Sequence, residues 1–311
     1  MTGLPPRLAP AAHLTVRPAG PRARRIGTAP PRARLLEELS PAAVAALDRL
    51  ADGPCATADL TGDDDGEVAA LLAVLLRAGL LADPDVEDRV RRRRAGTLVE
   101  VRGDGPLAVG VVTGLARAGI GLVSARVTGT TGADDVLAGL PVPPGRDRAA
   151  ALAAALRDAG ADPAPARRVP ADLVVLAGGT TAPPAGPVEH LFTAVRDGGG
   201  LVGPLVLPGR GPCAACAGAP GPGPSSAAPH VVVATAALTV GQALAAVDGP
   251  VRGGPPPASW GAVLALDPGT ATLVTRPGPG RPGCPCATGP ASVPPRTAAC
   301  GTGPPGWTIM V

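Results

Sequence analysis

Four of the six cysteines fall into two tight pairs, and these pairs constrain the fold more than any other feature of the sequence. Cys213 and Cys216 form a Cys-x-x-Cys knuckle, and Cys284 and Cys286 form a Cys-x-Cys knuckle later in the chain. A tetrahedral zinc site needs four soft ligands that converge on one point, and two short knuckles on separate turns commonly supply them. The spacing therefore predicts a structural Zn²⁺ site that ties the end of the chain to its middle.

The alternatives for these thiols are disulfide bonds or free cysteines, and the cellular compartment decides between them. The chain opens on prolines and Arg7 rather than on an apolar stretch, which argues against a signal peptide. Its most apolar run, residues 231–247, contains threonines and a glutamine and is predicted to be a buried helix rather than a membrane span. We therefore expect a cytoplasmic protein with no membrane partner, in which paired cysteines favour metal. Cys300 is the competing fourth ligand if Cys284 and Cys286 do not both reach the ion.

Composition leaves room for two domains and argues against nucleic-acid binding. The 311 residues include 44 glycines and 41 prolines, so ordered segments must alternate with Pro/Gly-rich connections. All 28 basic residues are arginine, and the formal net charge is only +3, which is too small to indicate a nucleic-acid partner. The aromatic residues Phe192, Trp260 and Trp307 offer no platform for base stacking. No nucleic acid is therefore expected among the partners.

Residues 1–88 predict a small winged helix-turn-helix domain, in which short strands precede three helices. Ser40-Pro41 is a helix start, with Ser40 as the N-cap and Pro41 in the first turn. The second helix follows a turn at residues 55–60. The predicted strands are residues 13–17, 24–26 and 32–36.

The third helix of this domain decides between the two usual ligands of such a fold, DNA and peptide. It is expected to be capped by Asp63–Asp65 and to run through residues 68–76, and its acidic start argues against contact with phosphates. A peptide that adds a strand to the small sheet, at the edge near residues 14–17, fits better. An accessory domain that only packs, and a DNA-binding regulator, are the alternatives.

An Arg-rich linker at residues 89–96 is expected to separate this domain from a Rossmann-like domain at 97–290. A strand, a glycine loop, a helix and a second strand succeed one another at residues 97–101, 103–108, 109–118 and 122–127. Gly103 and Gly105 are the loop positions where a phosphate would approach a helix N-terminus. Pro106 lies in this loop and no acidic residue follows the second strand, so the nucleotide loop is predicted to be vestigial.

The rest of the chain predicts a mainly parallel sheet covered on both faces. The expected elements are a helix at 148–159, a strand at 172–176, a helix at 187–196, a strand at 201–207, the helix at 231–247, and antiparallel strands near 262–266 and 271–275. The lone histidines His190 and His230 are predicted to be structural. Residues 291–311, which contain Cys300, are expected to form a Pro-rich tail, and Cys55 has no partner motif.

The string at residues 202–209, leading into Cys213-Ala214-Ala215-Cys216, resembles a known family. This family comprises ThiF-type, ubiquitin-activating-enzyme-like proteins of actinobacterial peptide natural-product clusters. The resemblance covers most of the chain and implies an α/β fold: an N-terminal winged helix-turn-helix peptide-recognition domain, then a Rossmann-like ThiF-type domain with a structural zinc site. Members bind the leader of a ribosomal precursor peptide and present its core to a YcaO-type cyclodehydratase, which makes thiazoles and oxazoles.

The same resemblance locates the residues that an active member would need. Adenylation requires an acid for the ribose, an acid for magnesium and basic groups on the triphosphate, including the family's lysine. At the corresponding strand ends this sequence has Thr128-Gly129 and Gly178-Gly179, and it has no lysine. The prediction is therefore a non-catalytic leader-peptide-binding scaffold with no catalytic residues. An active ThiF-like ATP-dependent adenylyltransferase is the alternative, a nicotinamide-dependent oxidoreductase is a weaker one, and a homodimer stays open.

Overall fold

The chain divides into two compact units, Met1–Arg89 with Pro295–Val311, and Val90–Pro294. The computed structural model describes residues 3–30, 32–62, 66–163, 170–178, 184, 186–221, 227–280, 283–284 and 286, and the backbone of 309–310. Several predictions lie outside the described residues: the cap at Asp63–Asp65, Gly179, most of the tail at 291–311, and Cys300 within it.

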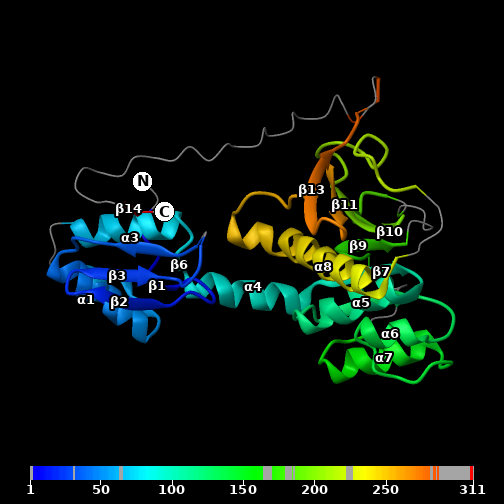
Figure 1. The fold of residues 1–311 in the computed structure, drawn as a ribbon, viewed down its shortest axis with the longest axis horizontal. Helices are drawn as coiled ribbons and strands as arrows, with labels where there is room; N and C mark the ends of the chain where they lie inside the picture. Colours follow the sequence, from blue (N-terminus) through cyan, green and yellow to red (C-terminus); the bar gives the residue numbers. More distant parts are fainter. Residues whose placement is uncertain are drawn as a thin grey trace. The chain divides into compact units, whose positions relative to one another are not determined.

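The first unit combines two small antiparallel sheets with three helices (Figure 1). One sheet has the strand order β5-β1-β6, and the other contains β4-β3-β2. The elements are β1 (Arg7–Pro10), β2 (Val16–Gly20), β3 (Ala23–Ile26), β4 (Arg34–Leu36), α1 (Pro41–Asp52), β5 (Cys55–Ala56), α2 (Thr57–Thr61), α3 (Glu67–Arg77) and β6 (Leu81–Ala82). Strands followed by three helices agree with the predicted order, and the winged-helix assignment stays a prediction.

Helix α1 begins where the sequence predicts it. The Ser40 hydroxyl accepts a hydrogen bond from the Ala43 amide (3.2 Å), and Pro41 occupies the first turn, where its missing N–H has no intrahelical partner to lose. Leu47 and Leu50, one turn apart, are fully buried. They pack in one core with Leu71, Leu72 and Leu75 of α3, so that the 3.6-residue period of each helix turns its leucines inward.

The last described residues of the chain return to the first unit. Ile309–Met310 form strand β14, which pairs antiparallel with Leu35 and Leu36 at the edge of β4. Two residues of the predicted Pro-rich tail therefore form a strand. Strand β4 has an open row of backbone groups on that side, and an extended segment satisfies them by pairing.

The segment predicted as an Arg-rich linker is helical. Helix α4 (Pro84–Gly96) has Asp85 and Glu87 in its first turn and Arg93 and Arg94 in its last. Acidic groups near the amino end and basic groups near the carboxyl end stabilise a helix through its dipole, which explains why this charged run is ordered. Arg94 makes a two-pronged ion pair with Asp248 of α8 (Pro229–Arg252), a buried carboxylate, so the end of α4 is fixed to the second unit.

The second unit contains a seven-stranded sheet with the order β13-β12-β11-β10-β9-β7-β8 (Figure 1). Strands β8, β7, β9 and β10 are parallel, and β11, β12 and β13 continue the sheet antiparallel. Its strands are β7 (Leu98–Gly103), β8 (Leu122–Arg126), β9 (Leu173–Ala177), β10 (Glu189–Arg196), β11 (Gly199–Val206), β12 (Ala262–Asp267) and β13 (Thr272–Pro277). The parallel part is thus confined to four strands.

The predicted helix at residues 187–196 is wrong, because this segment is strand β10. Its interior residues, Leu191–Val195, include β-branched and aromatic side chains and are buried on both faces of the sheet. Asp197 and Gly198 have φ of 50° and 78°, the positive values that a tight two-residue hairpin turn requires. Strand β11 therefore returns antiparallel to β10, and the prediction that residues 201–207 form a parallel strand is also wrong.

Helices cover one face of this sheet, and the main core of the unit lies beneath them. They are α5 (Gly105–Arg117), α6 (Ala133–Leu137), α7 (Arg148–Asp158) and α8 (Pro229–Arg252). Alternate residues of the strands face the other way, where Val174, Leu176, Phe192 and Val206 form a small second core. Within the described residues this second face is covered by a loop, not by helices: Ala214 and Ala219 pack on it. The sheet is therefore covered on both faces, as predicted, by helices on one face and by a loop on the other.

By length and composition alone, α8 is the one helix in the described part of the chain that could cross a membrane. In this fold it lies across β10 and β11 and packs against α5. Thr235 and Thr239 are fully buried, and the Thr239 hydroxyl donates to the Thr193 hydroxyl of β10 (2.8 Å). Contacts of this kind belong to a core helix, as the sequence predicts for residues 231–247.

Candidate metal centre and nucleotide edge

The two cysteine knuckles meet in space. The four Sγ atoms of Cys213, Cys216, Cys284 and Cys286 all lie within 4.8 Å of one another. The Cys213–Cys284 and Cys284–Cys286 sulfur separations are 3.8 and 3.4 Å, much longer than the roughly 2 Å of a disulfide. All four are free thiols. The structure thus brings together the four residues that spacing alone selected.

The loop that follows β11 forms the first half of this centre. The Ala217 amide donates to the Cys213 carbonyl (2.9 Å), which closes a turn around the two sulfurs. The Gly280 amide donates to the Cys216 carbonyl (3.0 Å), so the chain leaving β13 is held against the same turn. At Gly278 an added Cβ would lie 2.3 Å from the Cys216 carbonyl oxygen, so only glycine permits this approach. These contacts hold the chain that leads to the second knuckle, Cys284 and Cys286, against the first knuckle.

The thiols have unlike electrostatic surroundings. A backbone hydrogen bond from Cys216, helped by the neighbouring thiols, lowers the pKa of Cys213 to about 7. Cys216 is only 4% exposed, and this burial raises the pKa of its thiol to about 12. A buried thiol with a raised pKa stays protonated unless a cation compensates the thiolate charge. The centre is therefore suited to a metal ion, which replaces the protons of the four thiols.

The geometry fits tetrahedral zinc. Zn–S bonds of about 2.3 Å place tetrahedral ligand sulfurs roughly 3.8 Å apart, which is close to the Cys213–Cys284 separation. Four thiolates without an open position are typical of a structural site rather than a catalytic one. The described residues thus hold a cluster that could bind a metal such as zinc. Its place on the second face of the sheet makes it part of the cover over Phe192 and Val206.

Cys55 and His190 are not members of this four-sulfur cluster, although His190 lines the same cavity as Cys213 and Cys286. The Cys55 thiol is near the Arg49 and Gly53 carbonyl oxygens (3.4 and 3.5 Å) in the first unit. His190 is buried, its Nδ1 lies 2.9 Å from the Val188 carbonyl oxygen, and burial lowers its pKa. These local contacts are those of a structural histidine. Cys300 lies outside the described residues.

The two glycines of the predicted nucleotide loop have different roles. Gly103 ends β7 with φ of 147°, and an added Cβ would lie 2.0 Å from the Ala177 carbonyl oxygen of β9. Close packing of two strands therefore explains this glycine without a ligand. Gly105 has φ of 76° and open space around it. Because α5 begins at Gly105, Pro106 lies in the first helical turn and not in a loop, which corrects the prediction.

The charged groups at this edge are hydrogen-bonded to neighbouring residues. Asp104 accepts hydrogen bonds from the Thr128 amide (2.6 Å) and hydroxyl (2.8 Å). Arg148 donates to the Thr128 carbonyl (2.7 Å) and to the Asp135 carboxylate (3.2 Å), and Asp135 is 1% exposed. No pattern in the sequence indicates this network, apart from the position of Asp104 directly after a buried strand. Its effect is to join the ends of β7 and β8 to the start of α7.

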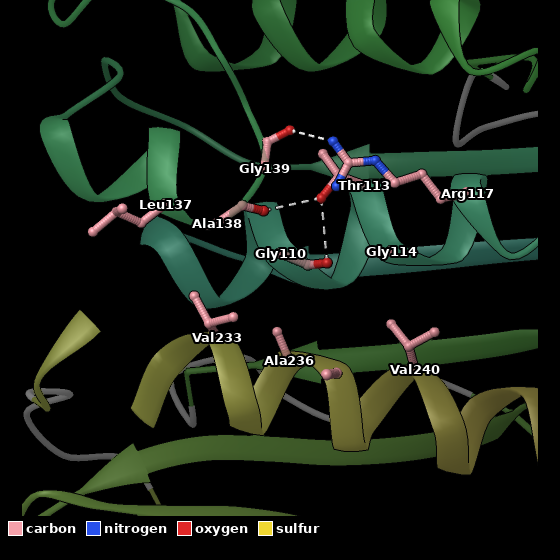
Figure 2. A pocket seen from close by; sticks show the side chains of 11 residues that line it. Gly110, Thr113, Gly114, Arg117, Leu137, Ala138, Gly139, Val233, Ala236 and Val240 are labelled. Carbon is pink, nitrogen blue, oxygen red and sulfur yellow. Dashed lines mark hydrogen bonds between the residues drawn. The ribbon is translucent and has the colours of Figure 1, made fainter. Parts of the chain in front are cut away.

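A cavity of about 300 Å³ lies along α5 and α8 and does not coincide with the nucleotide edge (Figure 2). Gly110 and Gly114 of α5 face Ala236 and Val240 of α8, and either glycine would place an added Cβ 2.8 Å from its neighbour. On the α6 side, the Thr113 hydroxyl donates to the Ala138 carbonyl (3.1 Å). This cavity begins more than a turn beyond Gly105, so a nucleotide held by the glycine loop would not fill it.

Solved structures of MccB share this architecture. The microcin C7 biosynthetic enzyme MccB in complex with N-formylated MccA matches with a TM-score of 0.69 at 12% identity, over 90% of this chain and 99% of that one. Escherichia coli MccB with ATP matches with a TM-score of 0.68 at 12% identity and the same coverage. PaaA matches more distantly, with a TM-score of 0.52 at 13% identity over 85% of this chain and 98% of PaaA.

No protein-family model and no curated protein matches the sequence. At 12% identity the similarity to MccB is a similarity of backbone fold and not of individual side chains. It extends over 90% of this chain, which is more than either of the two units contains. The chain shares the mixed α/β fold of MccB, with a parallel core sheet. Its own four-cysteine cluster could bind a metal such as zinc.

Proposed function

We propose that the protein is a non-catalytic scaffold that binds the leader of a ribosomal precursor peptide and presents its core to a YcaO-type cyclodehydratase. The proposal includes a winged-helix peptide-recognition domain in the first unit, a structural Zn²⁺ on the four cysteines and a cytoplasmic location. A homodimer is compatible with it.

The observation that supports the non-catalytic part is the hydrogen-bonded network at the nucleotide edge. A triphosphate needs free cationic groups, and magnesium needs a free carboxylate. Here Asp104 is engaged by Thr128, and Arg148 by Thr128 and Asp135. Breaking a buried pair such as Arg148–Asp135 to release the arginine would leave a charge uncompensated. The absence of lysine removes the other usual phosphate ligand.

The peptide-binding part is supported by the first unit and by the known complexes of the similar fold. MccB has been solved with MccA, which carries selenomethionine in one complex and is therefore an amino-acid chain. In this protein the β4-β3-β2 sheet already accepts an added two-residue strand, β14, along the edge of β4. An edge that pairs with one extended segment has the backbone geometry to pair with another.

The test is reconstitution with a YcaO-type enzyme and a short Cys/Ser/Thr-rich peptide encoded beside this chain. We expect the peptide to lose one water per ring only when all three proteins and ATP are present, because the scaffold raises the effective concentration of the peptide at the enzyme. Mass spectrometry of the peptide measures the loss. Equal ring formation without the scaffold would contradict the proposal, and a peptide lacking Cys, Ser and Thr in its core is the control.

The second candidate is an active adenylyltransferase, which the similarity to ATP-bound MccB favours. Because Asp104 and Arg148 at the nucleotide edge are already hydrogen-bonded within the protein, we expect no ATP–pyrophosphate exchange above background with the purified chain and its peptide. Radiolabelled pyrophosphate incorporation into ATP measures this, with an active adenylating enzyme as the positive control. Exchange that depends on the peptide would establish the enzyme and end the scaffold proposal.

A further inference from the structure

Two arginines lie directly opposite each other on the exposed face of the β4-β3-β2 sheet. Arg17 of β2 pairs with Arg25 of β3, and Arg25 in turn pairs with Leu35 of β4. The neighbouring residues Val16 and Ile26 are buried, so Arg17 and Arg25, one position along each strand, point to the opposite side and are exposed. Directly opposed residues of antiparallel strands have Cβ atoms about 5 Å apart. The sheet therefore holds the Cβ atoms of two arginines side by side on its exposed face.

Such a pair is unfavourable unless an anion lies between the two charges. The fold supplies anionic or carbonyl partners to the arginines beside it. Arg24 binds both carboxylate oxygens of Asp48, and Arg22 donates to the Glu38 and Leu39 carbonyls. For Arg17 and Arg25, no partner occurs among the residues that the structure describes. A repulsive pair that the protein leaves uncompensated is the arrangement expected where a ligand supplies the charge.

The charge around this pair distinguishes between the two kinds of anionic partner. Residues 1–89 contain ten arginines and thirteen acidic residues, a formal charge of −3, so the cationic pair is a local feature of an acidic unit. A nucleic acid needs an extended basic surface, which this unit does not have in sequence. A single carboxylate on a peptide needs only two convergent guanidinium groups.

We propose that Arg17 and Arg25 together bind an Asp or Glu side chain of the peptide recognised by the first unit. Leu35, next in the same cross-strand row, then contacts an apolar residue of that peptide. This inference rests on the proposed function, because it specifies the chemistry of the peptide that the scaffold binds. It predicts an acidic recognition motif in which a carboxylate lies beside an apolar side chain.

The test begins with a library of random short peptides displayed on their encoding RNA and selected on the full-length protein. We expect the enriched peptides to share an Asp or Glu, and their binding to fall roughly tenfold or more when that residue becomes Asn or Gln. The Arg17→Gln/Arg25→Gln variant should lose the same factor. The Arg157→Gln/Arg276→Gln variant makes the same change in net charge within the second unit and should bind as the natural protein does.

Thermal unfolding separates a binding role from a structural one. Removing two opposed like charges should leave the Tm of Arg17→Gln/Arg25→Gln unchanged or higher, although binding is lost. A lower Tm together with lost binding would make the pair structural and overturn the inference.

The other outcomes are equally distinct. Enriched peptides without acidic residues, or equal binding by the variant, would overturn the acidic motif and leave peptide binding intact. No enriched peptide at all would end the proposed function and this inference with it. Binding of a fluorescent single-stranded oligonucleotide that the variant loses would assign the pair to nucleic acid instead.

Discussion

Replacing Cys216 with serine is expected to remove the metal and destabilise the second unit. Cys216 is the most buried of the four cysteines, and a serine hydroxyl there would be a much poorer metal ligand than the thiolate that it replaces. Loss of a tightly held ion removes stabilisation of about 4 kcal/mol when the free ion is a thousandfold above its dissociation constant. For a unit of this size that corresponds to a fall in Tm of roughly 10 °C.

The loss should also be visible on the second face of the sheet. The knuckle loop covers Val174, Leu176, Phe192 and Val206 through Ala214 and Ala219, so a loosened loop exposes these apolar side chains. We expect Cys216→Ser to bind a hydrophobic dye that the natural protein excludes, and its metal content by mass spectrometry to fall below a tenth of the natural value. A chelator should reproduce both effects.

Cys55→Ser is the matched control, because Cys55 lies in the first unit and its thiol only approaches two carbonyl oxygens. It should keep the metal and the natural Tm. If Cys216→Ser retains a full equivalent of zinc with unchanged unfolding, the four cysteines do not form the predicted centre. Metal affinity should also fall as the pH falls, since the ion displaces protons, above all from Cys216, whose pKa is raised to about 12.

Gly103→Ala is expected to destabilise the second unit by about 3 kcal/mol or more. The added methyl carbon would lie 2.0 Å from the Ala177 carbonyl oxygen, and φ of 147° is unfavourable for alanine, so backbone strain adds to the overlap. Because Gly103 and Ala177 are cross-strand partners of β7 and β9, the clash separates two central strands. Urea unfolding followed by circular dichroism measures the change.

Gly105→Ala separates packing from ligand binding at the same loop. Gly105 has positive φ but open space around it, so the expected cost is about 1 kcal/mol from the left-handed conformation alone. If the loop serves a nucleotide, ATP should protect both variants against unfolding less than it protects the natural protein. We expect ATP to protect none of them, and equal costs for the two substitutions would contradict the packing argument.

Features that depend on local chemistry could be predicted from the sequence. Ser40 and Pro41 set the start of α1 because an N-cap and a proline act within one turn. The four cysteines could be assigned to one centre because few other arrangements place two knuckles on one ion. Likewise, the buried character of α8 followed from threonines that a lipid-facing helix would expose.

Strand β10 could not be predicted so easily, because its apolar run is compatible with a helix or a buried strand. The pair Asp197-Gly198 was the available signal, since Asp-Gly between apolar segments is typical of a hairpin. The network of Asp104, Thr128, Arg148 and Asp135 could not be found at all. It joins residues up to 44 positions apart whose meeting depends on the packing of α5, α6 and α7. Side-chain pairs of this kind are products of the fold.

The knuckle loop covers the second face of the sheet, so the four cysteines serve the fold whether or not the chain binds a nucleotide. Asp104 belongs to neither hydrophobic core of the second unit, and its substitution is expected to leave both cores intact. Loss of one of the four thiols is expected instead to uncover Phe192 and its neighbours. Tolerance to substitution should therefore be high at Asp104 and low at each of the four cysteines.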